Sequence, residues 1–184
     1  MKLEVRDNFY LSSVSPHDKT AYLKYFNEDK TISDAISVIP YPYKESDADW
    51  WIQRRLKFLQ DYGKEISFAF RNCEGNLIGS IGVDDFKIGK THSAEVGYWL
   101  AKEYRSRDLM TEALGIFVKY AFNSLQLIRL TAHTLDFNYA STRVLEKNRF
   151  KREGGLRQAE RNQNGIFDVF AWGLLKSEWQ QSSQ

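Results

Sequence analysis

Hydrophobic residues recur at four-residue steps between positions 109 and 122, a spacing that predicts an amphipathic helix. They are Leu109/Met110, Ala113/Leu114, Phe117/Val118 and Ala121/Phe122, which share one helix face. A strand-like run, residues 94–101, precedes this helix, and a short turn carrying Lys102, Arg105 and Arg107 joins the two. Because a helix N-terminus has unpaired N–H groups and a positive dipole end, this basic turn is suited to bind phosphate.

Strands and helices alternate along the rest of the chain. The pattern predicts strands over residues 3–14, 66–71, 76–83, 93–101, 128–135, 150–157 and 167–174. Two helices are expected to begin at Ser15 and Ser46, each in an N-cap position, and the second is expected to end at Gly63. A further helix is expected over residues 138–147, and a short helix or turn around residues 31–35.

This order of elements predicts a mixed α/β (α+β) fold. Its centre would be a mostly antiparallel, twisted sheet of about six to seven strands, flanked by about four helices. The strand–helix–strand unit at residues 94–135 implies one parallel pair with a right-handed crossover. No internal repeat or linker divides the sequence, so we expect a single domain over residues 1–184.

Composition and charge narrow the class of protein. The chain is 42% hydrophobic and 27% charged, as globular proteins are. No apolar run approaches the roughly 20 residues of a membrane span, and the lone Cys73 fits a reducing compartment, so a cytoplasmic protein is expected. The net charge of +2 gives no support for direct nucleic-acid binding. The scattered His17, His92 and His133 predict no metal site, and monomer and homodimer both remain open.

The turn and helix resemble a known cofactor signature. Residues 105–110 read Arg-Ser-Arg-Asp-Leu-Met where the GCN5-related N-acetyltransferases (GNAT) have R/Q-x-x-G-x-G/A, their acetyl-CoA-binding motif. The flanking words GYWLAKEYR and MTEAL are similar to the branch that acetylates the N-terminal alanine or serine of ribosomal proteins. Ser106 and Asp108 stand where this family usually has glycines.

The resemblance implies the GNAT fold over nearly the whole chain and acetyl-CoA as co-substrate. Backbone N–H groups of the turn would hold the pyrophosphate, aided by two arginines. The pantetheine arm would pair with the preceding strand, and amides near Trp99 and Leu100 would polarise the thioester carbonyl. The expected cofactor-binding residues are Trp99, Leu100, Ala101, Arg105, Ser106, Arg107, Asp108, Leu109, Met110, Thr111, Asn138 and Ser141.

The resemblance also implies catalytic residues. Asn138 and Ser141 match the family's N-x-x-S, in which the Asn contacts the CoA arm and the Ser donates a proton to the departing thiolate. Glu160 is the expected general base, because an ammonium cannot attack until it loses a proton. Asp168 matches a recurrent acidic position in the last strand, and Tyr139 is a second candidate proton donor.

Other roles for these residues remain open. Asn138 is a good helix N-cap without any cofactor, which would leave Ser141 an ordinary first-turn serine. Glu160 lies among Arg157 and Arg161 and could form a surface ion pair. The Asp108 carboxylate would repel phosphate or occupy the helix N–H groups as a cap, unless it turns to solvent. After the helix expected over residues 138–147, Arg149 stands where the family usually has a glycine before Phe150. Asn148 is expected to adopt the left-handed backbone instead.

The expected activity is transfer of an acetyl group to a primary amine, with a ribosomal or other protein N-terminus as the favoured acceptor. Two alternatives remain open on the sequence. One is a catalytically weak GNAT-fold module that binds or regulates. The other is an acetyltransferase for small molecules such as polyamines or antibiotics, because a fold does not determine its acceptor.

Overall fold

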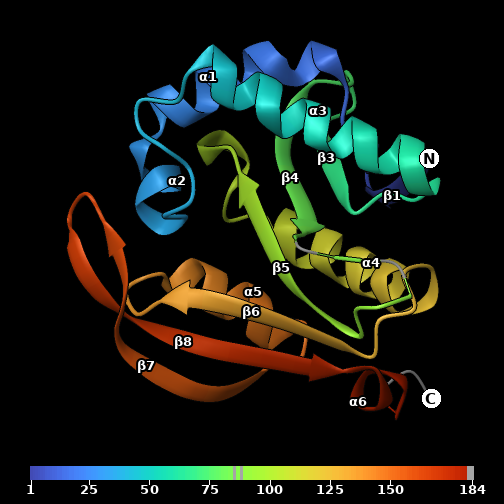
Figure 1. The fold of residues 1–184 in the computed structure, drawn as a ribbon, viewed down its shortest axis with the longest axis vertical. Helices are drawn as coiled ribbons and strands as arrows, with labels where there is room; N and C mark the ends of the chain where they lie inside the picture. The colour runs from blue at the N-terminus through green and yellow to red at the C-terminus, as the bar shows by residue number, and fades with distance from the viewer. Residues whose placement is uncertain (85, 88, 182–184) are drawn as a thin grey trace.

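The computed structural model describes residues 1–84, 86–87 and 89–181, and a twisted eight-stranded sheet runs through it (Figure 1). The strand order is β1-β2-β3-β4-β5-β6-β8-β7. The strands are β1 (Lys2–Arg6), β2 (Phe9–Ser13), β3 (Ser67–Arg71), β4 (Leu77–Val83), β5 (Ser93–Leu100), β6 (Arg129–Leu135), β7 (Lys151–Asn162) and β8 (Gly165–Leu175). The helices are α1 (Lys19–Glu28), α2 (Lys30–Ala35), α3 (Glu45–Tyr62), α4 (Leu109–Asn123), α5 (Tyr139–Lys147) and α6 (Lys176–Gln181).

The sheet has a break between β5 and β6. These two strands form the parallel pair that the sequence predicts, but they pair only over residues 93–95 and 129–131. Beyond that point β5 stays with β4 and β6 stays with β8, both antiparallel. The carboxyl ends of β5 and β6 therefore diverge and leave an open strand edge facing the space between them (Figure 1).

Two hydrophobic cores lie on opposite faces of the sheet. On one face α4 buries the apolar stripe predicted from its spacing, with Phe117 and Leu114 fully buried against the strands. On the other face α1 and α3 cover a second core, in which Tyr22 and Phe26 pack against Trp99 of β5. The alternation of β5 side chains thus anchors the strand in both cores.

The prediction of one continuous strand over residues 3–14 is wrong, because this segment folds as a hairpin of two strands, β1 and β2. Asp7 and Asn8 adopt left-handed backbone angles, with φ of 46° and 66°, and reverse the chain between β1 and β2. Short polar residues tolerate this conformation, so the pair makes a tight turn. The sheet accordingly has eight strands rather than six or seven, and counting the short α2 and α6 raises the helices of the described chain from about four to six.

Several element ends also differ from the prediction. The N-cap of α3 is Lys44 rather than Ser46, and its backbone N–H donates to Asp47 Oδ2 at 2.8 Å. Gly63 ends α3 as predicted, with a left-handed φ of 64°. After α5 it is Arg149, not Asn148, that adopts positive φ (64°). Asn148 has an ordinary φ of −94°, and its side chain donates to Thr111 O and Val144 O.

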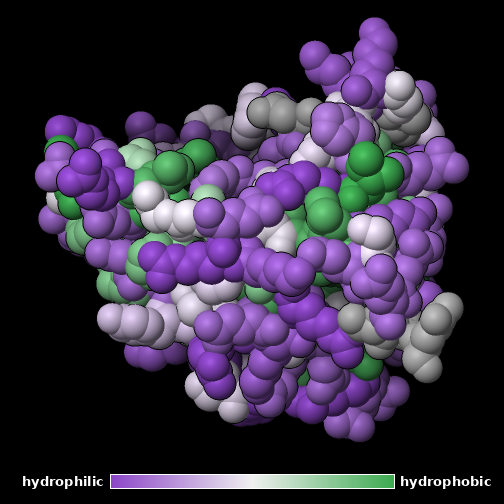
Figure 2. Space-filling view, turned by 90° about the horizontal axis from the view of Figure 1, so that it is seen from below, coloured by the Kyte–Doolittle hydropathy of each residue, from purple (hydrophilic) through white to green (hydrophobic). Residues whose placement is uncertain are grey.

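The surface formed around the β7–β8 hairpin is mostly hydrophilic, with hydrophobic residues in separate patches (Figure 2). Leu156 and Ile166 of this hairpin are about half exposed. None of the described helices has the length and apolarity needed to cross a membrane.

Candidate active site

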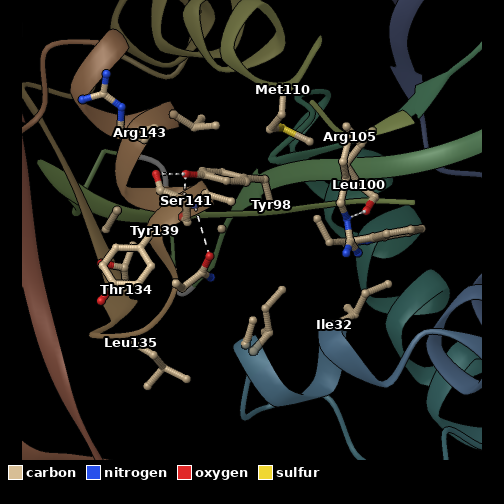
Figure 3. Close-up of a pocket in the computed structure, with 18 of the residues that line it drawn as sticks. Ile32, Tyr98, Leu100, Arg105, Met110, Thr134, Leu135, Tyr139, Ser141 and Arg143 are labelled. Atoms are coloured by element: carbon tan, nitrogen blue, oxygen red, sulfur yellow. Dashed lines mark hydrogen bonds between the residues drawn. The ribbon is translucent and has the colours of Figure 1, made fainter. Parts of the chain in front are cut away.

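A cavity of about 1050 Å³ occupies the space where β5 and β6 diverge (Figure 3). Its walls come from β5, β6, the turn before α4, the first turns of α4 and α5, and α2 with the loop that follows it. Of the residues predicted for the site, the cavity brings together Trp99, Leu100, Arg105, Ser106, Arg107, Asp108, Leu109, Met110, Thr111, Asn138, Tyr139, Ser141 and Glu160.

Two residues named from the sequence lie outside this cavity. Ala101 is fully buried, and its N–H donates to Ile78 O of β4 at 2.8 Å. Asp168 lines a separate shallow depression on the β7–β8 hairpin, where it accepts a hydrogen bond from the Gln158 N–H at 2.8 Å. Asp168 therefore stabilises the hairpin, and Glu160 is the acidic residue of this region that reaches the cavity.

The open edge of β5 presents particular backbone groups to the cavity. Because the Ala101 N–H bonds to β4, the alternation of an antiparallel ladder turns the N–H groups of Leu100 and Tyr98 away from β4. Consistent with this direction, Leu100 O accepts a hydrogen bond from Arg105 Nε at 2.8 Å rather than from β4. The amide of Trp99, named from the sequence as an oxyanion donor, points toward β4, so it is the N–H groups of Leu100 and Tyr98 that face the cavity.

The turn before α4 has the backbone of a glycine-rich loop without its glycines. Ser106 and Asp108 have φ of 60° and 58°, in the left-handed region where glycine is usually found. Within the described residues the Asp108 carboxylate does not cap α4. It pairs instead with Lys147 Nζ at 2.5 Å, and this hydrogen bond lowers the Asp108 pKa below its ordinary value. The N–H groups at the start of α4 are thus not occupied by the aspartate.

The two arginines of the turn have different roles. The Arg105 guanidinium donates to Asp29 Oδ2 at 2.6 Å and to Thr31 Oγ1 at 3.0 Å, so it ties the turn to α2. Arg107 is exposed, its carbonyl accepts a hydrogen bond from Arg6, and its guanidinium lies 6.0 Å from the Tyr104 ring centre. Arg107 is therefore the arginine of the pair whose charge is available to a ligand.

In the wall of the cavity, Ser141 of α5 forms a hydrogen-bonded pair with Tyr98 of β5 (Figure 3). Its Oγ lies 2.8 Å from the Tyr98 hydroxyl, and its backbone N–H donates to Asn138 Oδ1 at 3.1 Å. Burial raises the pKa of Tyr98 well above its ordinary value, so this hydroxyl keeps its proton. Asn138 caps α5 and thereby fixes the backbone of Ser141. This geometry fits both roles considered for the N-x-x-S motif, a helix cap and a site that binds CoA and donates a proton. Tyr139 is at the rim, 73% exposed.

Glu160 of β7 also lines the cavity and is half-buried. Its Oε1 accepts a hydrogen bond from Ser37 Oγ at 2.7 Å, and within the described chain it forms no ion pair with Arg157 or Arg161. Nearby, Asn162 Nδ2 donates to Asp34 O at 2.7 Å. These bonds join the end of α2 and its loop to the β7–β8 hairpin beside the cavity.

A second acidic group was missed by the sequence analysis. Glu95 of β5 lines the cavity, and its Oε1 lies 2.9 Å from His133 Nδ1 of β6. Both side chains are about half exposed, and the short parallel pairing brings them together. Tyr98 was missed for a similar reason. The Glu95–His133 pair depends on the strand register, and the Tyr98–Ser141 pair depends on where α5 packs. Neither of these has a local signal in the sequence.

The comparisons with known proteins agree with this geometry. A family model described as an acetyltransferase (GNAT) domain matches residues 8–151, and the chain belongs to this family. It is 34% identical over 116 residues to a probable N-acetyltransferase, YjcK, of Bacillus subtilis, a match that covers 63% of this chain and 62% of that protein. The matched part thus spans less than two thirds of that relative.

One curated relative named as a ribosomal-protein acetyltransferase matches over a longer part of the chain. The ribosomal-protein-serine acetyltransferase of Escherichia coli is 25% identical over 169 residues, covering 91% of this chain and 92% of that protein. A solved ribosomal L7/L12 alpha-N-protein acetyltransferase in complex with coenzyme A superimposes with a TM-score of 0.82 at 17% identity, over 95% of this chain and 98% of that one. This structural likeness supports the fold, and the family resemblance drawn from residues 105–110 is confirmed.

Proposed function

We propose that this protein is an acetyl-CoA-dependent N-acetyltransferase whose acceptor is a protein N-terminal amine of the ribosomal-protein type. The observation that carries the proposal is the cavity at the divergence of β5 and β6. Ser141, Tyr98 and Glu160 all line it. A proton donor and a carboxylate in one cavity suit an amine that attacks a thioester.

The cavity residues fit each part of acetyl-CoA. The N–H groups at the start of α4 are suited to the pyrophosphate, and Arg107 adds positive charge. The open edge of β5 can pair with the pantetheine amides as an added strand would. The N–H groups of Leu100 and Tyr98 are directed to hold the oxyanion that forms from the thioester carbonyl.

We propose the following sequence of bonds and protons. Glu160 removes a proton from the acceptor ammonium and releases it to water, and the neutral amine attacks the carbonyl carbon. As the tetrahedral intermediate collapses, the C–S bond breaks and the nitrogen loses its second proton to Glu160. The thiolate takes the Ser141 Oγ proton, Tyr98 replaces that proton, and solvent returns one to Tyr98. The Glu95–His133 pair is a second candidate base, because it lies in the same cavity.

The acceptor side of the cavity combines acidic and apolar groups. The carboxylates of Glu95, Glu160 and Asp34 favour a cationic amine, and the exposed Val38 and Phe137 offer apolar surface beside them. A protein N-terminus combines an ammonium with a neighbouring side chain, and the relatives named as ribosomal-protein acetyltransferases support this acceptor. A cytoplasmic location and a monomeric or homodimeric state remain predictions.

A panel of acceptors tests the proposal. Release of free CoA from acetyl-CoA is measured with peptides bearing the N-termini of ribosomal proteins, with the same peptides N-formylated as controls, and with polyamines and aminoglycosides. We expect turnover with the free-amine peptides and none with the formylated ones. Preference for polyamines or aminoglycosides would support the small-molecule alternative. No binding of acetyl-CoA at millimolar concentration in calorimetry would contradict any acetyltransferase activity.

A further inference from the structure

An ion pair joins two helices at the phosphate end of the cavity. Asp108 is the residue that immediately precedes α4, and Lys147 is the last residue of α5. Lys147 Nζ lies 2.5 Å from Asp108 Oδ1, both residues line the cavity, and their side chains are 47% and 58% exposed. The pair therefore borders the N–H groups that the proposed function assigns to the pyrophosphate.

The packing of the two helices holds Lys147 at this position. The next residue, Asn148, donates through Nδ2 to Thr111 O of α4 at 2.9 Å and to Val144 O of α5 at 3.0 Å. Its Oδ1 lies close to Gly115, where an added Cβ would come within 3.1 Å. The end of α5 is thus fixed against the first turns of α4, and the lysine is placed by the fold rather than by a mobile loop.

The charges around this turn make Lys147 the partner of the aspartate. Arg6 pairs with Glu112 at 2.8 Å, and Arg143 pairs with Glu146 at 2.7 Å. A lone carboxylate beside the pyrophosphate would repel it, since like charges a few ångströms apart destabilise each other. An ammonium has three N–H donors, so Lys147 can bond Asp108 and a phosphate oxygen at the same time.

We propose that Lys147 binds the pyrophosphate of CoA and that Asp108 is a positioning residue that holds its ammonium there. The two residues act as a neutral pair where the family usually has a glycine. Lys147 supplies the positive charge that offsets Asp108. This inference rests on the proposed function. It concerns how this chain binds phosphate despite an acidic residue in its motif.

A double-mutant cycle tests the proposal. Dissociation constants for CoA are measured by calorimetry at low salt for the wild type, Lys147→Met, Asp108→Asn and the double variant. Asn is chosen because it tolerates the left-handed backbone, and Met because it keeps the helix and the aliphatic stem. We expect Lys147→Met to weaken binding by about tenfold, since it loses a contact and leaves the carboxylate unpaired. The double variant should recover to within about threefold of Asp108→Asn.

Two controls separate this role from general electrostatics. Arg143→Met removes a cation that also lines the cavity, and Asp108→Asn should not rescue its loss of affinity. Dephospho-CoA keeps the pyrophosphate but lacks the 3′-phosphate, so the Lys147→Met defect should persist with it. Circular dichroism and thermal melting show whether each variant is folded.

The outcomes distinguish the two proposals. A wild type that binds no CoA would contradict the proposed function. If the wild type binds CoA but the effects of the two substitutions simply add, the coupling of Lys147 to Asp108 is wrong while the function stands. A defect that disappears with dephospho-CoA would overturn the assignment to the pyrophosphate.

Discussion

Ser141 and Tyr98 form the hydroxyl pair on which the proposed proton delivery depends. The two hydroxyls are 2.8 Å apart, and burial raises the pKa of Tyr98, so its proton is retained at neutral pH. Asn138 fixes the backbone of Ser141 through the N-cap bond and does not depend on the serine side chain. The serine hydroxyl can therefore be removed without disturbing the start of α5.

Ser141→Ala should abolish proton delivery while leaving cofactor binding intact. We expect kcat to fall by about 100-fold, the lower end of the range for loss of a general acid, with the dissociation constant for CoA unchanged. Tyr98→Phe removes only the hydroxyl behind the serine and should lower kcat by about tenfold. Stopped-flow turnover and calorimetry check both. Equal loss of CoA binding in Ser141→Ala would mean that the serine binds the cofactor instead.

The identity of the base is decided by comparing Glu160→Gln with Glu95→Gln and His133→Gln. We expect Glu160→Gln to lower kcat/KM by about 100-fold. With Glu160 as the base, the other two variants should stay within about threefold of the wild type, because they alter only an exposed pair that does not take the proton. A larger loss in Glu95→Gln or His133→Gln would assign the base to that pair.

At the level of elements, α2 and the β7–β8 hairpin enclose the acceptor side of the cavity together. Asn162 and Gln163 of the hairpin end both donate to Asp34 of α2, and Ser37 donates to Glu160. Figure 1 shows these two segments, far apart in the chain, side by side at one end of the sheet. Their contacts position Glu160 and border the acceptor's path.

Asn162→Ala should weaken acceptor use without affecting the cofactor. The variant loses the bond to Asp34 O, about 1 kcal/mol, and a second bond that Asn162 Oδ1 accepts from the Asn164 N–H within the hairpin turn. Loss of the bond to α2 is expected to raise KM for a peptide acceptor by about fivefold and to leave KM for acetyl-CoA unchanged. The matched control is Asn76→Ala, in the β3–β4 turn, where the side chain bonds only to Glu74 among the described residues. Steady-state kinetics with each substrate varied in turn measures the difference. An equal rise in both KM values would argue against this role.

Elements with local signals could be predicted from the sequence, and contacts between distant elements could not. The apolar spacing of α4 and the terminator Gly63 are local, and both are confirmed. The turn at Asp7 and Asn8 was missed because the apolar residues before and after it fall on the same odd-numbered positions, although polar residues 6–8 interrupt the alternation. The pairing of Asp108 with Lys147 depends on how α4 and α5 pack, so reading the motif alone indicated only a repulsive charge.

At the scale of the whole molecule, buried tyrosines in both cores link stability to alkaline pH. Burial raises the pKa of Tyr22 to about 12 and that of Tyr120 to about 12. Their folded-state pKa values exceed the unfolded value of about 10, so the unfolded chain releases protons first as pH rises. The stability that they contribute is complete below about pH 10 and is lost as the pH rises toward 12.

Urea unfolding between pH 8 and 11.5 should show this loss. Above pH 10 the free energy of unfolding should fall with a slope approaching about 1.4 kcal/mol per pH unit for each such tyrosine. Tyr22→Phe removes one titrating group, so the slope of the unfolding free energy against pH should be shallower by up to about 1.4 kcal/mol per pH unit. A slope that is unchanged in Tyr22→Phe would contradict the assignment to that residue.

Because β5 diverges from β6, hydrogen exchange at the free edge of β5 can show whether a ligand is bound there. The amides of Tyr98 and Leu100 face the cavity rather than another strand, so they can exchange hydrogen with solvent while the sheet stays folded. A pantetheine arm that pairs with this edge would protect them. Deuterium uptake at these two positions should therefore slow on addition of acetyl-CoA, whereas the Trp99 amide, already bonded toward β4, should exchange slowly in both states.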